Sequence, residues 1–174
     1  AFQFERIILK ATEMNLGTCW LGGTFDKSRA ARDIDLQEDE KLPAVSPVGY
    51  VEKHGMVGRV VRWVVKAKKR KPWEELFFQM EGQSLESLSK EEVKSNGNKY
   101  SKALELVRLG PSAKNGQPWR VLFEEDGKKI HLYRANPSQF ARLDIGIATC
   151  HFHLAVKEDD ISGSWKFLPE TDRN

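Results

Sequence analysis

The chain has 174 residues, enough for one domain with a buried core, and its 40% hydrophobic and 30% charged residues exclude a disordered protein. Its net charge of +3 is too small to indicate nucleic-acid binding, and no apolar stretch approaches the roughly 20 residues that span a bilayer. The two cysteines form neither a disulfide framework nor a zinc pattern, so we expect a reducing, cytoplasmic environment.

The first half of the chain predicts alternating helices and strands. Apolar residues from Phe4 to Met14 recur at spacings of three and four, which is typical of an amphipathic helix, and we expect Gly17 to end it. The predicted elements are a helix at residues 4–16, a strand at 18–25, a surface helix at 27–41 and a buried strand at 42–50. Residues 54–63 show no clear period.

The second half predicts a longer series of elements that ends with a strong helix. Ser89 and Glu92 form a capping-box pattern, residues 125–128 supply a hairpin turn, and Asp144 is expected to cap the last helix. The predicted elements are a short helix from Pro72, a polar connector at 80–87, a helix from Ser89, a helix at 100–109, strands at 119–123 and 129–134, a helix at 145–157 and a strand from Trp165.

The most distinctive stretch is residues 110–120, where two glycines and two prolines bracket a loop. Gly110 can end the preceding helix by adopting a positive φ, and Pro111 cannot continue that helix. Three polar side chains of the loop can donate and accept hydrogen bonds without being strong acids or bases: Ser112, Asn115 and Gln117. Such a loop suits a planar ligand with polar edges. The alternative is an ordinary connection from helix to strand.

Two weaker features accompany this loop. Gly22 and Gly23 would let a ligand approach the backbone without obstruction by a Cβ, although a turn without a ligand is the simpler interpretation. Residues 66–71 contain five basic side chains, a pattern typical of a solvated surface or of contact with polyanions. In an extended segment, Lys68 and Arg70 would point the same way and could hold a phosphate group.

No constellation of side chains for acid–base, nucleophilic or metal chemistry stands out. Cys19 has no positioned base beside it, so we interpret it as a small buried residue. Cys150 and His153 share one helix face, but no third metal ligand accompanies them. The sequence therefore predicts neither a catalytic side chain nor a metal site.

Five segments together carry a resemblance to a known family. They are LGTCWLGG at 16–23, PVGY at 47–50, KKRKP at 68–72, PSAKNGQPWR at 111–120 and DIGIATCH at 144–151. In this order and over nearly the whole chain, they resemble the FMN-dependent nitroreductases. The chain is most similar to the TM nitroreductase-like branch, in which one polypeptide carries two related halves and imitates the usual dimer.

The resemblance implies that FMN is the cofactor and assigns roles to the matching residues. The residues implied to contact the flavin from the neighbouring half are Pro111, Ser112, Ala113 and Asn115. Those implied to lie near flavin N5 through their backbone are Leu21, Gly22 and Gly23. Those implied to reach the FMN phosphate are Lys68 and Arg70. Many relatives have Glu-Gly near N5, where this chain has two glycines.

The resemblance also implies an α+β fold, a three-layer sandwich with a central, mostly antiparallel sheet flanked by helices. Residues 1–83 would be the C-terminal part of a first half and residues 84–174 the second half, with the family's N-terminal part lying outside this sequence. The implied function is transfer of hydride or electrons from NAD(P)H through FMN to a nitroaromatic, quinone or similar acceptor. The alternative is a degenerate flavin-binding member with a non-catalytic role. We expect a monomeric pseudo-dimer or a homodimer, with neither a nucleic acid nor a membrane as partner.

Overall fold

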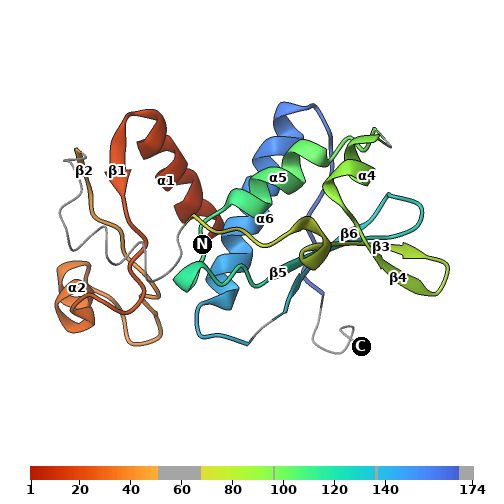
Figure 1. The fold of residues 1–174 in the computed structure, drawn as a ribbon. Helices are drawn as coiled ribbons and strands as arrows, with labels where there is room; N and C mark the ends of the chain where they lie inside the picture. The colour runs from red at the N-terminus through yellow and green to blue at the C-terminus, as the bar shows by residue number, and fades with distance from the viewer. Residues whose placement is uncertain (51–67, 96, 136, 169–174) are drawn as a thin grey trace.

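The computed structural model describes residues 1–50, 68–95, 97–135 and 137–168, so the segment 54–63 lies outside the described residues (Figure 1). The helices are α1 (Phe2–Glu13), α2 (Lys27–Asp33), α4 (Lys90–Ser95), α5 (Ser101–Leu109) and α6 (Ala141–Glu158), with short 3-10 helices η1 (Trp73–Glu75) and η2 (Ala113–Asn115). The strands are β1 (Leu16–Thr18), β2 (Val48–Tyr50), β3 (Phe77–Glu81), β4 (Ser84–Ser87), β5 (Trp119–Phe123) and β6 (Ile130–Arg134). No described helix is both long and apolar enough to cross a membrane.

The larger sheet has four strands in the order β4-β3-β5-β6. Strands β3 and β5 are parallel, and the other two neighbouring pairs are antiparallel. Helices α5 and α6 pack against each other beside this sheet, and η1 lies against β3 and β4 (Figure 1). This arrangement confirms the predicted α+β class and the mostly antiparallel sheet.

Strand β5 forms the centre of the hydrophobic core. Its residues alternate between buried and half-buried because successive side chains of a strand point to opposite faces of the sheet. Trp119, Val121 and Phe123 occupy the buried face, together with Leu104 and Val107 of α5. The hairpin of β5 and β6, with Gly127 at a φ of 62° in its turn, agrees with the prediction from sequence.

Residues 80–87 form a hairpin, so the predicted polar connector is wrong. Met80 pairs with Leu85 across a turn in which Gly82 has a φ of 59°. The polar sequence concealed β4 because this edge strand is fully exposed and is held by backbone pairing with β3. The predicted boundary between residues 83 and 84 falls in this turn, and the division into two related halves stays a prediction.

The N-terminal helix ends earlier than the sequence indicated. The C-cap of α1 is Met14, and Asn15 has a φ of 59°, a value that asparagine tolerates better than most residues. Gly17, the expected helix stop, instead lies in β1 opposite Gly49. Asn15, and not Gly17, adopts the left-handed conformation after the helix.

The buried strand expected at 42–50 is also wrong. Only the last three residues form β2, and all three are exposed, with Tyr50 89% accessible. An isolated bridge pairs Leu21 with Val45. Proline lacks the N–H that a strand ladder requires, so Pro43 and Pro47 restrict this segment to an irregular edge.

Helix α6 begins at Ala141, four residues before the predicted start. Asp144 therefore lies in the first turn and does not cap the helix. No strand is assigned between residues 161 and 168, so the strand expected from Trp165 is wrong. Trp165 instead packs edge-on against Phe152, with ring centroids 5.8 Å apart.

Two helix-end predictions had different outcomes. The capping box is confirmed: Glu92 N–H donates to Ser89 Oγ at 3.2 Å, and Ser89 N–H donates to Glu92 Oε2 at 2.7 Å. Gly110 does follow the last residue of α5, but its φ is −53° and not positive. A Cβ on Gly110 would lie 3.1 Å from the carbonyl oxygen of Val107, so close packing accounts for this glycine.

Candidate functional site

The loop between α5 and β5 has a strained backbone. Lys114, Asn115 and Gln117 have positive φ values of 51°, 55° and 46°. For residues that carry a Cβ, the left-handed conformation costs roughly 1–2 kcal/mol each. Such strain persists only where surrounding contacts enforce it, and it is concentrated at ligand-binding and active sites.

Gln117 supplies many of those contacts. The residue is only 3% exposed, and its Oε1 accepts a hydrogen bond from Lys71 N–H at 2.8 Å. Its Nε2 donates to the carbonyl oxygens of Asn115 at 3.2 Å and Lys69 at 3.4 Å. The backbone N–H of Gln117 donates to Ser112 Oγ at 2.9 Å. The amide that we expected to face a ligand therefore ties the loop to the 68–71 segment.

Arg70 makes the second connection between the loop and the basic segment. Its Nη2 donates to Leu109 O at 3.0 Å, and its Nη1 donates to Asn115 Oδ1 at 3.1 Å. Asn115 Nδ2 donates in return to Lys69 O at 2.7 Å. Burial, followed by the neighbouring Arg108, lowers the pKa of the Arg70 guanidinium. Two of the predicted site segments, far apart in sequence, are thus joined by direct hydrogen bonds.

The ion pair of Arg108 and Glu105 on α5 also contacts the basic segment 68–71. Arg108 Nη1 donates to Lys71 O at 3.3 Å. Its Nε and Nη2 donate to the two carboxylate oxygens of Glu105 at 2.9 Å and 2.8 Å. Trp73 Nε1 adds a third hydrogen bond to Glu105 at 3.0 Å. The bond from Arg108 is the main reason that the pKa of Glu105 falls to about 2.

Asp144 attaches the loop to α6. Ala113 N–H donates to Asp144 Oδ1 at 2.9 Å, and Asp144 is 3% exposed. Burial raises the pKa of Asp144, and the hydrogen bond from Ala113 opposes that rise. The aspartate that we predicted as a helix cap therefore serves the loop, through a contact that the sequence did not reveal.

Replacement of Asp144 by asparagine and by alanine should separate its charge from its hydrogen bond. Asp144→Ala leaves Ala113 N–H without this acceptor and should cost about 1–2 kcal/mol of unfolding free energy. Asp144→Asn keeps an acceptor and should cost nothing at pH 7. Because the folded-state pKa is raised, the wild type should lose stability relative to Asp144→Asn as pH rises above about 4. Urea unfolding at pH 4 and pH 7 measures both effects, and equal losses in the two variants would contradict this role.

Gly22 approaches an aromatic side chain of the protein itself. A Cβ built on Gly22 would lie 2.5 Å from Cε1 and 2.9 Å from Cζ of Phe140, and a Cβ on Gly23 would lie 3.9 Å from that Cζ. Phe140 precedes α6, and its carbonyl oxygen accepts the N–H of Asp144 at 3.0 Å. The glycine pair and the loop therefore meet the same N-terminal turn of α6.

The predicted site residues fall into two groups in the structure. Arg70 and Asn115 are directly bonded, and Lys68 is exposed beside them. Ser112 and Ala113 lie in the same loop. Leu21 is held by two backbone hydrogen bonds to Val45, each of 2.9 Å, and leads to the glycine pair. The flavin contacts implied for these residues stay predictions.

A buried polar cluster escaped the sequence analysis. Glu5 of α1 is 1% exposed and bonds both Trp20 and His151. The sequence did contain a sign of this cluster, because Glu5 lies three residues before the buried Ile8, on the apolar face of the helix. A carboxylate at that position predicts a buried hydrogen-bonding partner.

The cysteines show no sign of nucleophilic or metal chemistry. Cys19 is exposed, contrary to the expectation of burial, and its N–H donates to Ser46 Oγ at 3.0 Å. Cys150 is buried, and burial is the main reason that its pKa rises to about 11, so its thiol stays protonated near neutral pH. Within the ranges that the structure describes, no three or more metal-binding side chains cluster.

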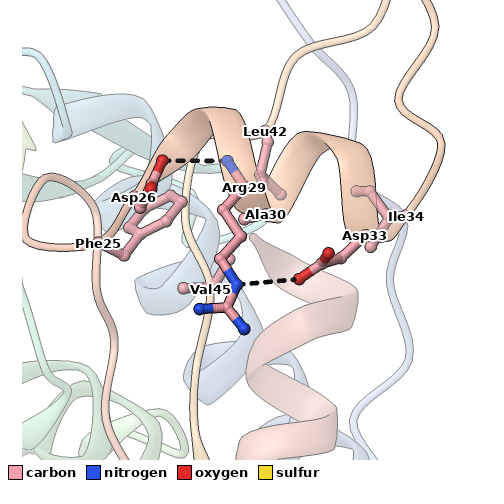
Figure 2. A pocket seen from close by; sticks show the side chains of 8 residues that line it. All are labelled: Phe25, Asp26, Arg29, Ala30, Asp33, Ile34, Leu42 and Val45. Carbon is pink, nitrogen blue, oxygen red and sulfur yellow. Dashed lines mark hydrogen bonds and ion pairs between the residues drawn. The ribbon is translucent and has the colours of Figure 1, made fainter.

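A shallow hollow of about 350 Å³ lies beside α2, as Figure 2 shows. The residues that line it are Phe25, Asp26, Arg29, Ala30, Asp33, Ile34, Leu42 and Val45. Within it, Asp26 Oδ1 accepts Arg29 N–H at 3.0 Å, and Arg29 Nε lies 3.9 Å from Asp33 Oδ2. None of the residues implied to contact FMN lines this hollow.

Comparison with known proteins agrees with this fold. The structure is similar to the crystal structure of a putative nitroreductase from Thermotoga maritima, with a TM-score of 0.56 and 24% sequence identity. The match covers 91% of this chain and 54% of that chain, so the sequence spans about half the length of that protein. No curated protein matches. The family described as "Putative TM nitroreductase" matches residues 1–156, and the chain therefore belongs to this nitroreductase family.

Proposed function

We propose that the protein is an FMN-dependent oxidoreductase that passes hydride or electrons from NAD(P)H to a nitroaromatic, quinone or similar acceptor. The observation that carries this proposal is the strained 110–118 loop bonded to the basic 68–71 segment. These hydrogen bonds bring the basic side chains of residues 68–71 next to the polar loop. Cationic side chains bind an anionic phosphate, and a few fixed polar groups can orient a planar ligand with polar edges.

The residues present fit FMN chemically. Lys68 and Lys69 are exposed at the edge of the loop, where an ammonium group can bind a phosphate oxygen. Arg70 holds Asn115 and Leu109, so in this proposal it keeps the loop in place and adds positive charge near the phosphate. Bound FMN would supply the hydride chemistry that the side chains cannot.

The protein would then act by holding and orienting the ligand. Backbone groups of Leu21, Gly22 and Gly23 would lie along one edge of the flavin. Pro111, Ser112, Ala113 and Asn115 would form another wall. A ligand that contacted Gly22 from the side of its missing Cβ would have to displace the ring of Phe140. No side chain of this set needs to transfer a proton.

Lys68→Ala is expected to weaken FMN binding to the full-length protein about tenfold, the value of one charge-assisted hydrogen bond. Lys128→Ala is the matched control, because Lys128 is an exposed lysine in the β5–β6 turn. Quenching of flavin fluorescence measures both dissociation constants. Equal affinities of the two variants would remove Lys68 from the phosphate site, and a wild type unable to bind FMN would refute the proposed function.

A non-catalytic flavin binder is the second candidate. The contact of Phe140 with Gly22 favours it, because the ring lies where a ligand could otherwise approach the glycine. Anaerobic mixing of the FMN-loaded protein with NADH or NADPH distinguishes the two candidates. Bleaching of the yellow colour within seconds supports the oxidoreductase, whereas unchanged absorbance supports the binder.

We also propose a cytoplasmic protein that is a monomeric pseudo-dimer or a homodimer. The free thiols of Cys19 and Cys150 support a reducing compartment. Sedimentation of the full-length protein with and without FMN separates the two assembly states, because only a homodimer has twice the mass of its chain.

A further inference from the structure

The buried carboxylate of Glu5 bridges two parts of the chain. Its Oε2 accepts a hydrogen bond from Trp20 Nε1 at 2.9 Å. Its Oε1 lies 2.8 Å from His151 Nε2. Trp20 is fixed further by the ring of Phe4, which packs edge-on with a centroid distance of 4.8 Å. Both oxygens of a residue that is 1% exposed are thus committed to side chains outside its own helix.

Each partner of Glu5 lies next to one of the two segments that are proposed to contact the flavin. We call these segments, residues 21–23 and residues 110–118, the two walls. Trp20 immediately precedes Leu21, which begins the segment with the glycine pair. His151 lies on α6, and its Cδ2 is 3.6 Å from the position that a Cβ on Gly110 would occupy. Gly110 is the first residue of the strained loop. The carboxylate therefore contacts one residue next to each wall.

A carboxylate in this place is costly for stability alone. Burial of a charge is unfavourable unless hydrogen bonds compensate, and an apolar residue on the buried face of α1 would avoid the cost. Buried polar groups in several proteins fix one arrangement of packed elements, because any other arrangement leaves them unpaired. Glu5 meets this condition, since its bonds exist only when α1, Trp20 and α6 have their present relative positions.

We propose that Glu5 is a positioning residue that fixes the distance between the glycine pair and the 110–118 loop, and so sets the width of the flavin site. The mechanical coupling of the two walls depends only on the hydrogen bonds of Glu5, whereas its effect on FMN rests on the proposed function.

Three variants of the full-length protein test the coupling. Glu5→Ala removes both hydrogen bonds. Glu5→Gln keeps an acceptor for Trp20 and offers an N–H to His151, which can adopt the tautomer with an unprotonated Nε2. Val93→Ala is the control, because Val93 is a core residue of α4, 2% exposed and part of the core around α5 and β5, so it loses stability without touching either wall.

Amide hydrogen exchange without FMN is the first readout. Glu5→Ala should raise exchange about tenfold at the hydrogen-bonded amides of Leu21 and Val45 and also at those of Gly110 and Ala113, because local opening at both walls becomes easier. Glu5→Gln should restore wild-type exchange at all four amides. Faster exchange confined to α1, or equal acceleration in Val93→Ala, would overturn the coupling.

FMN affinity is the second readout. Glu5→Ala should weaken FMN binding about tenfold, while Glu5→Gln and Val93→Ala should stay within about twofold of the wild type. Unchanged affinity in Glu5→Ala would overturn the effect on the flavin. A wild type that binds no FMN would refute the proposed function, and the exchange pattern would still decide whether Glu5 couples the walls.

Discussion

Replacement of Gln117 by leucine is expected to destabilise the protein by about 3 kcal/mol and to release the 110–118 loop. Leucine has a similar volume but leaves Lys71 N–H and the carbonyl oxygen of Asn115 without these partners, while Lys69 O keeps its hydrogen bond from the Asn115 side chain. Each unpaired buried group costs about 1–3 kcal/mol. Without the amide, the bonds of Arg70 and Asp144 to the loop remain, but fewer contacts offset the positive φ of Lys114 and Asn115, so the loop should relax toward ordinary backbone conformations.

The matched control is Gln83→Leu, the same substitution in the exposed turn between β3 and β4. An exposed position away from such contacts should change stability by less than about 0.5 kcal/mol. Urea unfolding followed by tryptophan fluorescence measures both variants. If Gln117→Leu unfolds at the same urea concentration as Gln83→Leu, the amide does not hold the loop.

Glu105 is expected to contribute about 2 kcal/mol of unfolding free energy at pH 7, and Glu105→Gln should lose it. The pKa of this carboxyl falls from 4.5 to about 2, chiefly through its hydrogen bond from Arg108. A shift of that size corresponds to about 3 kcal/mol, and partial exposure of the side chain to solvent reduces it. Arg108 also supports Lys71 O, so the loss should reach the basic segment.

The sign of the pH dependence follows from the lowered pKa. The contribution of Glu105 should be complete above pH 4.5 and should disappear as pH falls toward about 2, where the carboxyl becomes protonated in the folded state. Urea unfolding of the wild type and Glu105→Gln at pH 7, 4.5 and 3 therefore should show a shrinking difference. Glu91→Gln, an exposed carboxyl of α4, is the control. A difference that stays constant with pH would contradict the ion-pair explanation.

Local sequence patterns predicted those elements whose stability is local. The capping box of Ser89 and Glu92 and the β5–β6 hairpin both follow from residues that are neighbours in the chain. Burial on one face of β5 follows from its alternating side chains. Strand β4 was missed because its residues are exposed and polar, and only the adjacent β3 makes it a strand.

For the candidate site, too, local sequence located the segments but did not show which side chains they contact. The PSAKNGQPWR motif at 111–120 singled out the loop, but its residues gave no sign that Gln117 points inward. Gly22 suggested close approach by a ligand, and the side chain that approaches it is Phe140, more than a hundred positions away. The predicted end of the first helix at Gly17 was wrong because Asn15 adopts the left-handed conformation there.

The sequence by itself determined the nitroreductase resemblance, the α+β class and the segments from which the site is built. These depend on motifs and on periodicity, which are properties of neighbouring residues. The tertiary structure decided what each polar side chain contacts: Arg70 with Asn115, Asp144 with Ala113, and Glu5 with Trp20 and His151. The bond between Ala113 and Asp144 spans 31 positions, and the bond between Glu5 and His151 spans 146. No local pattern predicts which distant donor will meet a buried acceptor.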